Sequence, residues 1–207
     1  GALVLAVLGV LVRYQVPGAT HSREISFEGT RLDGLGLAPG FRLVDQNGAP
    51  VSLSDFRGRV VVLSLLDPDC TDICPIYAYH YRLAYQSLGE DAAKVAFLAF
   101  NANDKKTSVD EVAAATKKWG MEEIPPWHFL TGSPEALQDV WRAYSVVASS
   151  LSKPDKPDEQ QHTPALFVID QAGQRRWYFS THFEGAPAAS ALIVKHVRAL
   201  LAEGQRR

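Results

Sequence analysis

The chain has 207 residues, of which 46% are hydrophobic and 21% charged, a composition that suits one sizeable globular core. Its 21 Lys and Arg residues nearly balance its 23 Asp and Glu residues, and the net charge of -2 gives no basic excess that would indicate a nucleic-acid partner. Two cysteines are too few for a disulfide scaffold. Because only three residues separate them, they indicate a redox pair or a metal clip.

Residues 1–12 contain no charged or polar side chain, but twelve residues are fewer than the roughly 20 that span a bilayer. The only methionine is Met121, so we expect residues 1–14 to be part of a longer N-terminal membrane anchor or signal segment. Arg13 and Tyr14 would then mark the water interface. The anchored protein would face an extracytoplasmic compartment, which in a bacterium is the periplasm. The alternative is a buried first helix or strand.

Residues 15–38 show no strong period and predict a linker with short edge strands near 24–27 and 30–32. We place the main domain at residues 39–207. At its start, Asn47-Gly48 stands between two alternating stretches, a strong signal for a β-hairpin.

A run of β-branched and leucine side chains at residues 60–66 predicts a central strand buried on both faces. Aspartate and proline end it, and Cys70 and Cys74 follow at once. Pro75 fits the first turn of a helix. A helix that begins here would set Cys74 beside its N-terminus, where unpaired amides and the helix dipole favour a thiolate.

The remaining patterns alternate between helix and strand. Ile76, Tyr79, Leu83 and Leu88 have helical spacing and predict an apolar face. The polar stretch 149–161 predicts a mobile surface loop. The other predicted elements are strands at 94–100, 127–130, 165–169 and 175–179 and helices at 108–120, 133–144 and 186–203. This order is that of the thioredoxin-like α/β fold, a central mixed sheet flanked by helices, here with an N-terminal β-hairpin.

Five of the six histidines have structural explanations. They are His21 in the linker, His80 and His196 on helices, His128 within a strand and His182 after the last strand. His162 differs, because it stands directly before the strand predicted at 165–169. In a thioredoxin-like sheet the segment that enters this strand runs beside the cysteine loop, so we expect His162 near the cysteines.

These features together resemble the Sco (SenC/PrrC) family, thioredoxin-like membrane-anchored proteins that serve cytochrome c oxidase assembly. The resemblance spans about residues 39–185. It rests on the hairpin with Asn47-Gly48, residues 53–58, the motif Cys70-x-Asp72-Ile73-Cys74-Pro75, residues 127–132 and His162 before a strand ending in Ile169-Asp170. It implies a copper site with Cys70, Cys74 and His162 as ligands.

The chemistry of this donor set agrees with that implication. Two thiolates and one imidazole suit the soft, low-coordinate Cu(I) ion, whereas structural zinc usually has four protein ligands. The predicted function is a Cu(I) metallochaperone that assists copper-site assembly in cytochrome c oxidase. Its partner would be the copper-bearing oxidase subunit or another copper or thiol protein, with the membrane contacted through the N-terminal segment.

Two departures from the family bear on the thiols. Asp67-Pro68-Asp69 replaces an aromatic-threonine lead-in and adds negative charge, which we expect to raise the thiol pKa values. Thr163-Pro164 resembles the cis-proline of dithiol oxidoreductases and favours thiol exchange.

Two enzymatic alternatives therefore stay open. The first is a thiol–disulfide oxidoreductase in which Cys70 and Cys74 are the catalytic pair and the more exposed thiolate attacks. The sequence does not decide which cysteine that is. The second is a peroxiredoxin-type peroxidase, which residues 55–58 also resemble. That family has proline and threonine seven and three residues before its cysteine, where this chain has Asp67 and Thr71 before Cys74.

Overall fold

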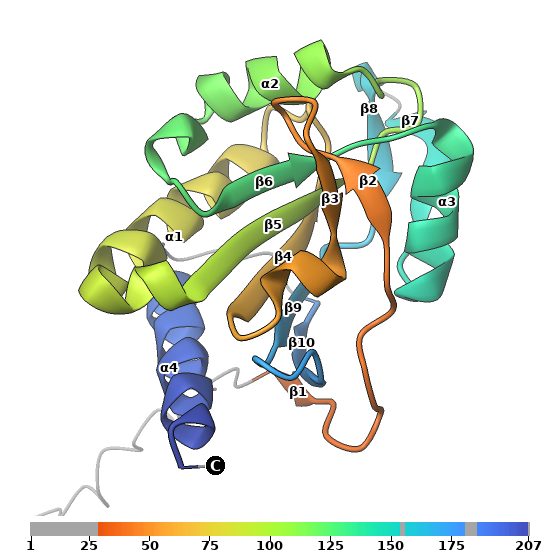
Figure 1. Ribbon diagram of the computed structural model, residues 1–207. Coiled ribbons are helices and arrows are strands. Elements are labelled where there is room, and N and C mark those ends of the chain that lie inside the picture. The colour runs from red at the N-terminus through yellow and green to blue at the C-terminus, as the bar shows by residue number, and fades with distance from the viewer. Residues whose placement is uncertain (1–28, 154–155, 181–185, 207) are drawn as a thin grey trace, which may run out of the picture.

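A computed structural model describes residues 29–153, 156–180 and 186–206 of the chain. At its centre is a six-stranded mixed sheet in the order β1-β10-β9-β4-β5-β6 (Figure 1). Its strands are β1 (Thr30–Arg31), β4 (Val60–Leu66), β5 (Val95–Asn101), β6 (Trp127–Leu130), β9 (Leu166–Ile169) and β10 (Arg175–Phe179). Strand β4 runs parallel to β5 and antiparallel to β9, and β5 runs parallel to β6. The predicted mixed sheet is confirmed.

Helices cover both faces of this sheet, and they bury its two central strands completely. The helices are α1 (Ile73–Leu88), α2 (Val109–Lys118), α3 (Pro134–Ala143) and α4 (Ala186–Gly204), with 3-10 turns η1 (Leu53–Phe56), η2 (Gly89–Lys94) and η3 (Met121–Glu123). Side chains alternate along a strand, so β4 contributes to the core on both faces of the sheet. Val60 and Val62 pack on the side of α1, α2 and α4. Val61 and Leu63 pack on the side of α3. Figure 1 shows this layering.

A separate two-stranded antiparallel sheet pairs β2 (Arg42–Val44) with β3 (Pro50–Ser52) on the α3 side. The buried Asp45 carboxylate organises the turn between them, because its Oδ1 accepts the amides of Asn47 at 2.9 Å and Ala49 at 3.0 Å. Gly48 takes a positive φ of 76°, a backbone conformation in which glycine is favoured.

Two predictions of local structure are wrong. The stretch 149–161 is not a loop, because β7 (Ala148–Lys153) pairs antiparallel with β8 (Lys156–His162). Two polar strands that satisfy each other's backbone groups leave no hydrophobic period for sequence reasoning to detect. The apolar face of α1 is also different: Ile76 and Tyr79 are 39% and 48% exposed. The side chains that α1 buries are those of Cys74, Tyr77, Ala78, His80, Tyr81, Ala84 and Leu88.

Several predictions fall outside the described residues. They concern the apolar stretch 1–12, the edge strand near 24–27, His21 and His182. Within the described part of the chain, the helices are too short or too polar for a membrane span.

Candidate dithiol and metal site

The two cysteines lie where the central strand β4 ends and α1 begins. No disulfide joins them, and both are buried, with 2% exposure for Cys70 and none for Cys74. Backbone amides hold the sulfurs in place: the Asp67 N–H donates to Cys74 Sγ and the Cys74 N–H donates to Cys70 Sγ, each at 3.4 Å. Asp72 caps the helix by accepting the Ile73 N–H at 2.6 Å. The loop therefore presents two neighbouring sulfurs at the N-terminus of α1.

The two thiols differ in acidity. A hydrogen bond from the Cys74 side chain lowers the pKa of Cys70, an effect that outweighs burial and the Cys70 thiol's own 3.0 Å hydrogen bond to Asp72 Oδ1. Burial raises the pKa of Cys74 well above the ordinary thiol value, and the hydrogen bond to Cys70 and the charge of Cys70 add to this rise. The thiolate expected at Cys74 is therefore favoured at Cys70 instead. The expected rise in both pKa values is right for Cys74 and wrong for Cys70.

A buried polar network braces the cysteine loop from the neighbouring strand. The Asp67 carboxylate is fully buried and accepts the Asp69 N–H at 2.9 Å and the Asn103 side-chain amide at 3.0 Å through its Oδ1. Asn103 belongs to the loop after β5, and its own N–H donates to Asn101 Oδ1 at 2.8 Å. Lys106 adds an ion pair with Asp69 at 3.4 Å.

Sequence reasoning missed the role of Asp72, Asn103 and Lys106 in this network. A usable signal was present, because adjacent parallel strands bring the residues after their carboxyl ends to one edge of the sheet. Residues 102–104 and the cysteine loop both follow such strand ends.

His162 is the last residue of β8 and is half-buried. It pairs with Ala148 across the hairpin, and its Nδ1 lies 3.3 Å from the Thr163 carbonyl. The antiparallel register of β4 and β9 ends with Ser64 opposite Leu166. His162 lies four residues before Leu166, so the chain leads from it into β9 at the edge of the sheet where β4 ends and the cysteine loop begins. The described residues contain no group of three His, Cys, Asp or Glu side chains arranged to hold a metal ion, so His162 is not gathered with the cysteines.

Thr163 fixes the base of this hairpin. Its N–H donates to the Val147 carbonyl at 2.6 Å, and its hydroxyl accepts the Val147 N–H at 3.1 Å. No peptide bond in the described ranges is cis, so the Thr163-Pro164 bond is trans and the expected cis-proline is wrong.

The other described histidines have structural surroundings. His128 Nδ1 lies 3.1 Å from Asp45 Oδ2, and its ring packs against Phe56 with centroids 5.3 Å apart. His196 is buried against Trp177 and Phe179, and His80 is buried on α1.

The structure has a thioredoxin-like sheet with a dithiol after its central strand. Comparison with known proteins identifies a family with which this geometry agrees. The SCO1/SenC family model matches residues 31–198. The chain belongs to the SCO1/SenC family. A SCO2-like protein of Rickettsia typhi is 22% identical over 176 residues, which cover 83% of this chain and 82% of that protein.

Two further similarities are one of structure and one of sequence. The crystal structure of Arabidopsis thaliana ScoI with copper bound aligns with a TM-score of 0.67 and 20% identity, covering 79% of this chain and 99% of that one. A chloroplastic peroxiredoxin Q of Sedum lineare is 32% identical over 146 residues, covering 70% of this chain and 68% of that protein. The peroxidase-type similarity therefore extends across much of the SCO1/SenC domain, but Asp67 stands where the peroxidase signature has proline.

Chemically, this site offers two sulfurs in contact, one of which binds its proton much more tightly than the other. Such a pair fits a soft, thiophilic ion. It also fits dithiol chemistry, in which one thiol attacks and the other resolves. The donors present are compatible with copper, with His162 as the imidazole on the segment that leads into β9.

Proposed function

We propose that this SCO1/SenC protein is a Cu(I) metallochaperone that binds the ion through Cys70, Cys74 and His162. The observation that carries the proposal is the pair of buried, hydrogen-bonded sulfurs after β4, with His162 four residues before β9, the strand that pairs antiparallel with β4. Thiolates select Cu(I) over hard cations, and a solved relative, Arabidopsis thaliana ScoI, holds copper.

Metal binding would displace the thiol protons. Cys74 keeps its proton most tightly because it is buried, so Cu(I) affinity is expected to rise with pH. His162 would complete the site by a movement of the β7–β8 hairpin toward the loop. A ligand on a separate hairpin suits a protein that both takes up and releases its cargo.

A Cu(I) titration against a competing chelator tests this function. The reduced protein is expected to bind one Cu(I) per chain, and Cys74→Ser is expected to abolish tight binding because a hydroxyl is a poor ligand for a soft ion. Thr71→Ala, a change at an exposed position in the same loop, serves as the matched control and should bind normally. Tight binding by Cys74→Ser would contradict the proposal.

The difference between the two thiols supports thiol–disulfide exchange as a second candidate. In that reaction the Cys70 thiolate attacks a partner disulfide, forms a mixed disulfide and releases one partner thiolate. Cys74 then attacks the Cys70 sulfur and releases the second partner thiol, so the partner is reduced and this pair is oxidised. Reduction of insulin or of an oxidase-derived disulfide peptide should be lost in Cys70→Ser. Absence of turnover by the wild type would count against this candidate.

We also propose that the partner is the copper-bearing subunit of cytochrome c oxidase and that residues 1–14 attach the protein to the extracytoplasmic side of a membrane. The uncharged stretch 1–12 supports the attachment. Fractionation of cells that express the chain tests it: the protein should stay with membranes after carbonate washing and be digested by protease added from the extracytoplasmic side.

A further inference from the structure

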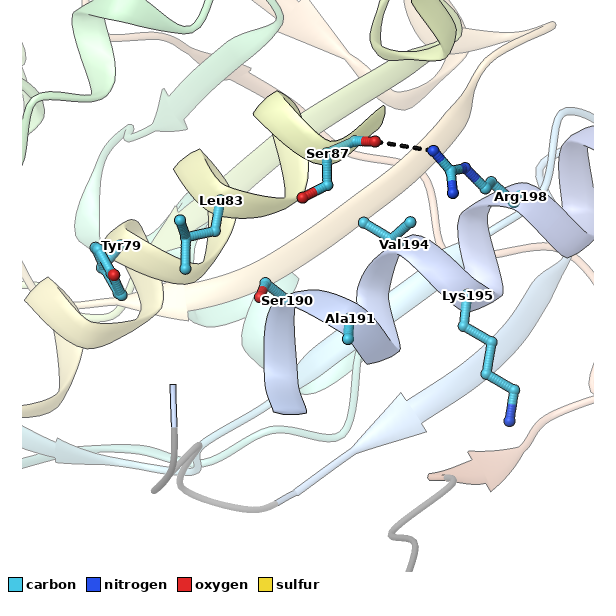
Figure 2. Close-up of a pocket in the computed structure, with 8 residues that line it drawn as sticks. All are labelled: Tyr79, Leu83, Ser87, Ser190, Ala191, Val194, Lys195 and Arg198. Atoms are coloured by element: carbon cyan, nitrogen blue, oxygen red, sulfur yellow. Dashed lines mark hydrogen bonds between the residues drawn. The ribbon is translucent and has the colours of Figure 1, made fainter. Parts of the chain in front are cut away.

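A groove runs between α1 and α4 on the face of the sheet that carries the cysteines. Its volume is about 600 Å³, within the roughly 300–1,000 Å³ of typical ligand sites. Tyr79 and Leu83 of α1 line one wall and Val194 of α4 lines the other (Figure 2). At the far end the Arg198 guanidinium donates to the Ser87 carbonyl at 2.8 Å, so the two helices are tied together there.

The apolar wall of this groove continues toward the dithiol. Ile76, Tyr79 and Leu83 are spaced three and four residues apart and therefore follow one stripe of α1. This stripe belongs to the apolar face that the sequence predicts, and Ile76 and Tyr79 are exposed in the first two turns of the helix. Tyr79 stands five residues after Cys74, about 8 Å along the helix axis. The groove therefore begins within about two turns of the end of α1 that follows the cysteine loop.

The charge of the groove is one-sided. Among the described residues that line it, Lys195 and Arg198 are cationic and none is acidic. Asp91 is close enough to feel the charge of Arg198, but it forms an ion pair with Lys94 at 2.8 Å. Figure 2 shows Arg198 across the closed end and Lys195 on the outer rim, directed away from α1. An acidic group on a bound partner would be attracted to this end.

We propose that this groove docks the protein that receives copper or electrons from Cys70 and Cys74, through a segment with apolar side chains followed by an acidic one. The proposal rests on the proposed function and names the surface that the partner uses. From Tyr79 to Ser87 the groove spans eight residues of α1, about 12 Å, which matches roughly two turns of a helix. A surface that binds anionic lipid is typically flat and carries many basic residues, whereas this groove is concave and has two cations. The groove therefore fits a protein segment better than a lipid surface.

The test measures binding of the full chain to the soluble copper-bearing domain of the oxidase subunit, prepared with its own cysteines oxidised. The groove variant Tyr79→Ser/Arg198→Glu is expected to raise the Kd for this domain about tenfold or more. The matched control Leu35→Ser/Lys118→Glu also replaces one large apolar side chain with serine and reverses one positive charge, at exposed positions elsewhere, and should bind like the wild type. Because Arg198 ties α4 to α1, the single variant Tyr79→Ser provides a second test and should weaken binding in the same direction.

An unchanged Kd in the groove variant, an equal loss in the control or absence of binding by the wild type would overturn the proposal. A groove variant that lost only self-association, or only binding to phosphatidylglycerol vesicles, would overturn it as well. Cu(I) stoichiometry and the reaction with a small aromatic disulfide are measured on the same variants and should not change. If Cu(I) binding fails in the wild type while docking still depends on the groove, the proposed function fails and the docking surface stands.

Discussion

The cysteine loop and the β7–β8 hairpin bring the two halves of the candidate site together in different ways. The loop is held from several directions, by backbone amides on both sulfurs, by the buried Asp67 and by Asn103 and Lys106 from the strand next to it. The hairpin pairs with itself, the bonds between Thr163 and Val147 close its base, and Ala148 packs against the core on the α3 side. This difference indicates a fixed dithiol approached by a ligand on a separate element.

The largest expected effect concerns the two thiols of the fixed loop. Iodoacetamide should modify Cys70 first, and at a lower pH than an ordinary thiol with a pKa of about 8.5, because a lowered pKa moves thiolate formation to lower pH. Cys74 should react only at higher pH, since burial raises its pKa. Peptide mass spectrometry after timed labelling measures both rates, with the urea-unfolded protein as control. Equal rates in the folded protein would mean that the loop does not distinguish its two sulfurs.

The next effect tests the ligand on the hairpin. His162→Ala should weaken Cu(I) binding by at least about 10–100-fold. Removing a residue that only orients a metal ligand already costs this much affinity, and His162 is expected to be a ligand itself. His128→Gln is the matched control, because His128 contacts Asp45 and Phe56 instead. Unchanged Cu(I) affinity in His162→Ala would remove His162 from the ligand set.

A smaller effect is expected where the loop is braced. Asn103→Ala removes a side-chain donor from the buried Asp67 carboxylate and should lower the free energy of unfolding by about 1–3 kcal/mol. Urea unfolding measures this, with the exposed Gln86→Ala on α1 as control. A change no larger than that of the control would show that the network does not stabilise the loop.

The smallest effect belongs to the half-exposed ion pair between Lys106 and Asp69. Lys106→Met should lower the free energy of unfolding by about 1 kcal/mol or less, because solvent screens such a pair. The difference from wild type should shrink as salt is added. A loss as large as that of Asn103→Ala would mean that the loop depends on its surface contacts as much as on its buried ones.

The same contrast explains what could be predicted from the sequence. The continuous apolar run at 60–66 and the residues around Cys70 and Cys74 carry their signal locally, so the central strand, the helix start and the SCO1/SenC membership follow from them. The acidity of the two thiols does not, because it depends on burial and on a hydrogen bond between their side chains. The polar hairpin also escaped prediction, since its strands have no hydrophobic period. The exposure of Ile76 and Tyr79 could not be predicted either. Their helical spacing identifies an apolar face, but it does not say whether that face contacts the core or the solvent.

The structure of the bound metal centre tests the central claim most directly. X-ray absorption spectroscopy of the Cu(I)-loaded wild-type protein is predicted to show two sulfur ligands and one nitrogen ligand, with the nitrogen lost in His162→Ala. A centre with two sulfur ligands and no nitrogen ligand in the wild type would contradict the account. Copper would then be bound by the cysteine loop alone, without His162 of the hairpin.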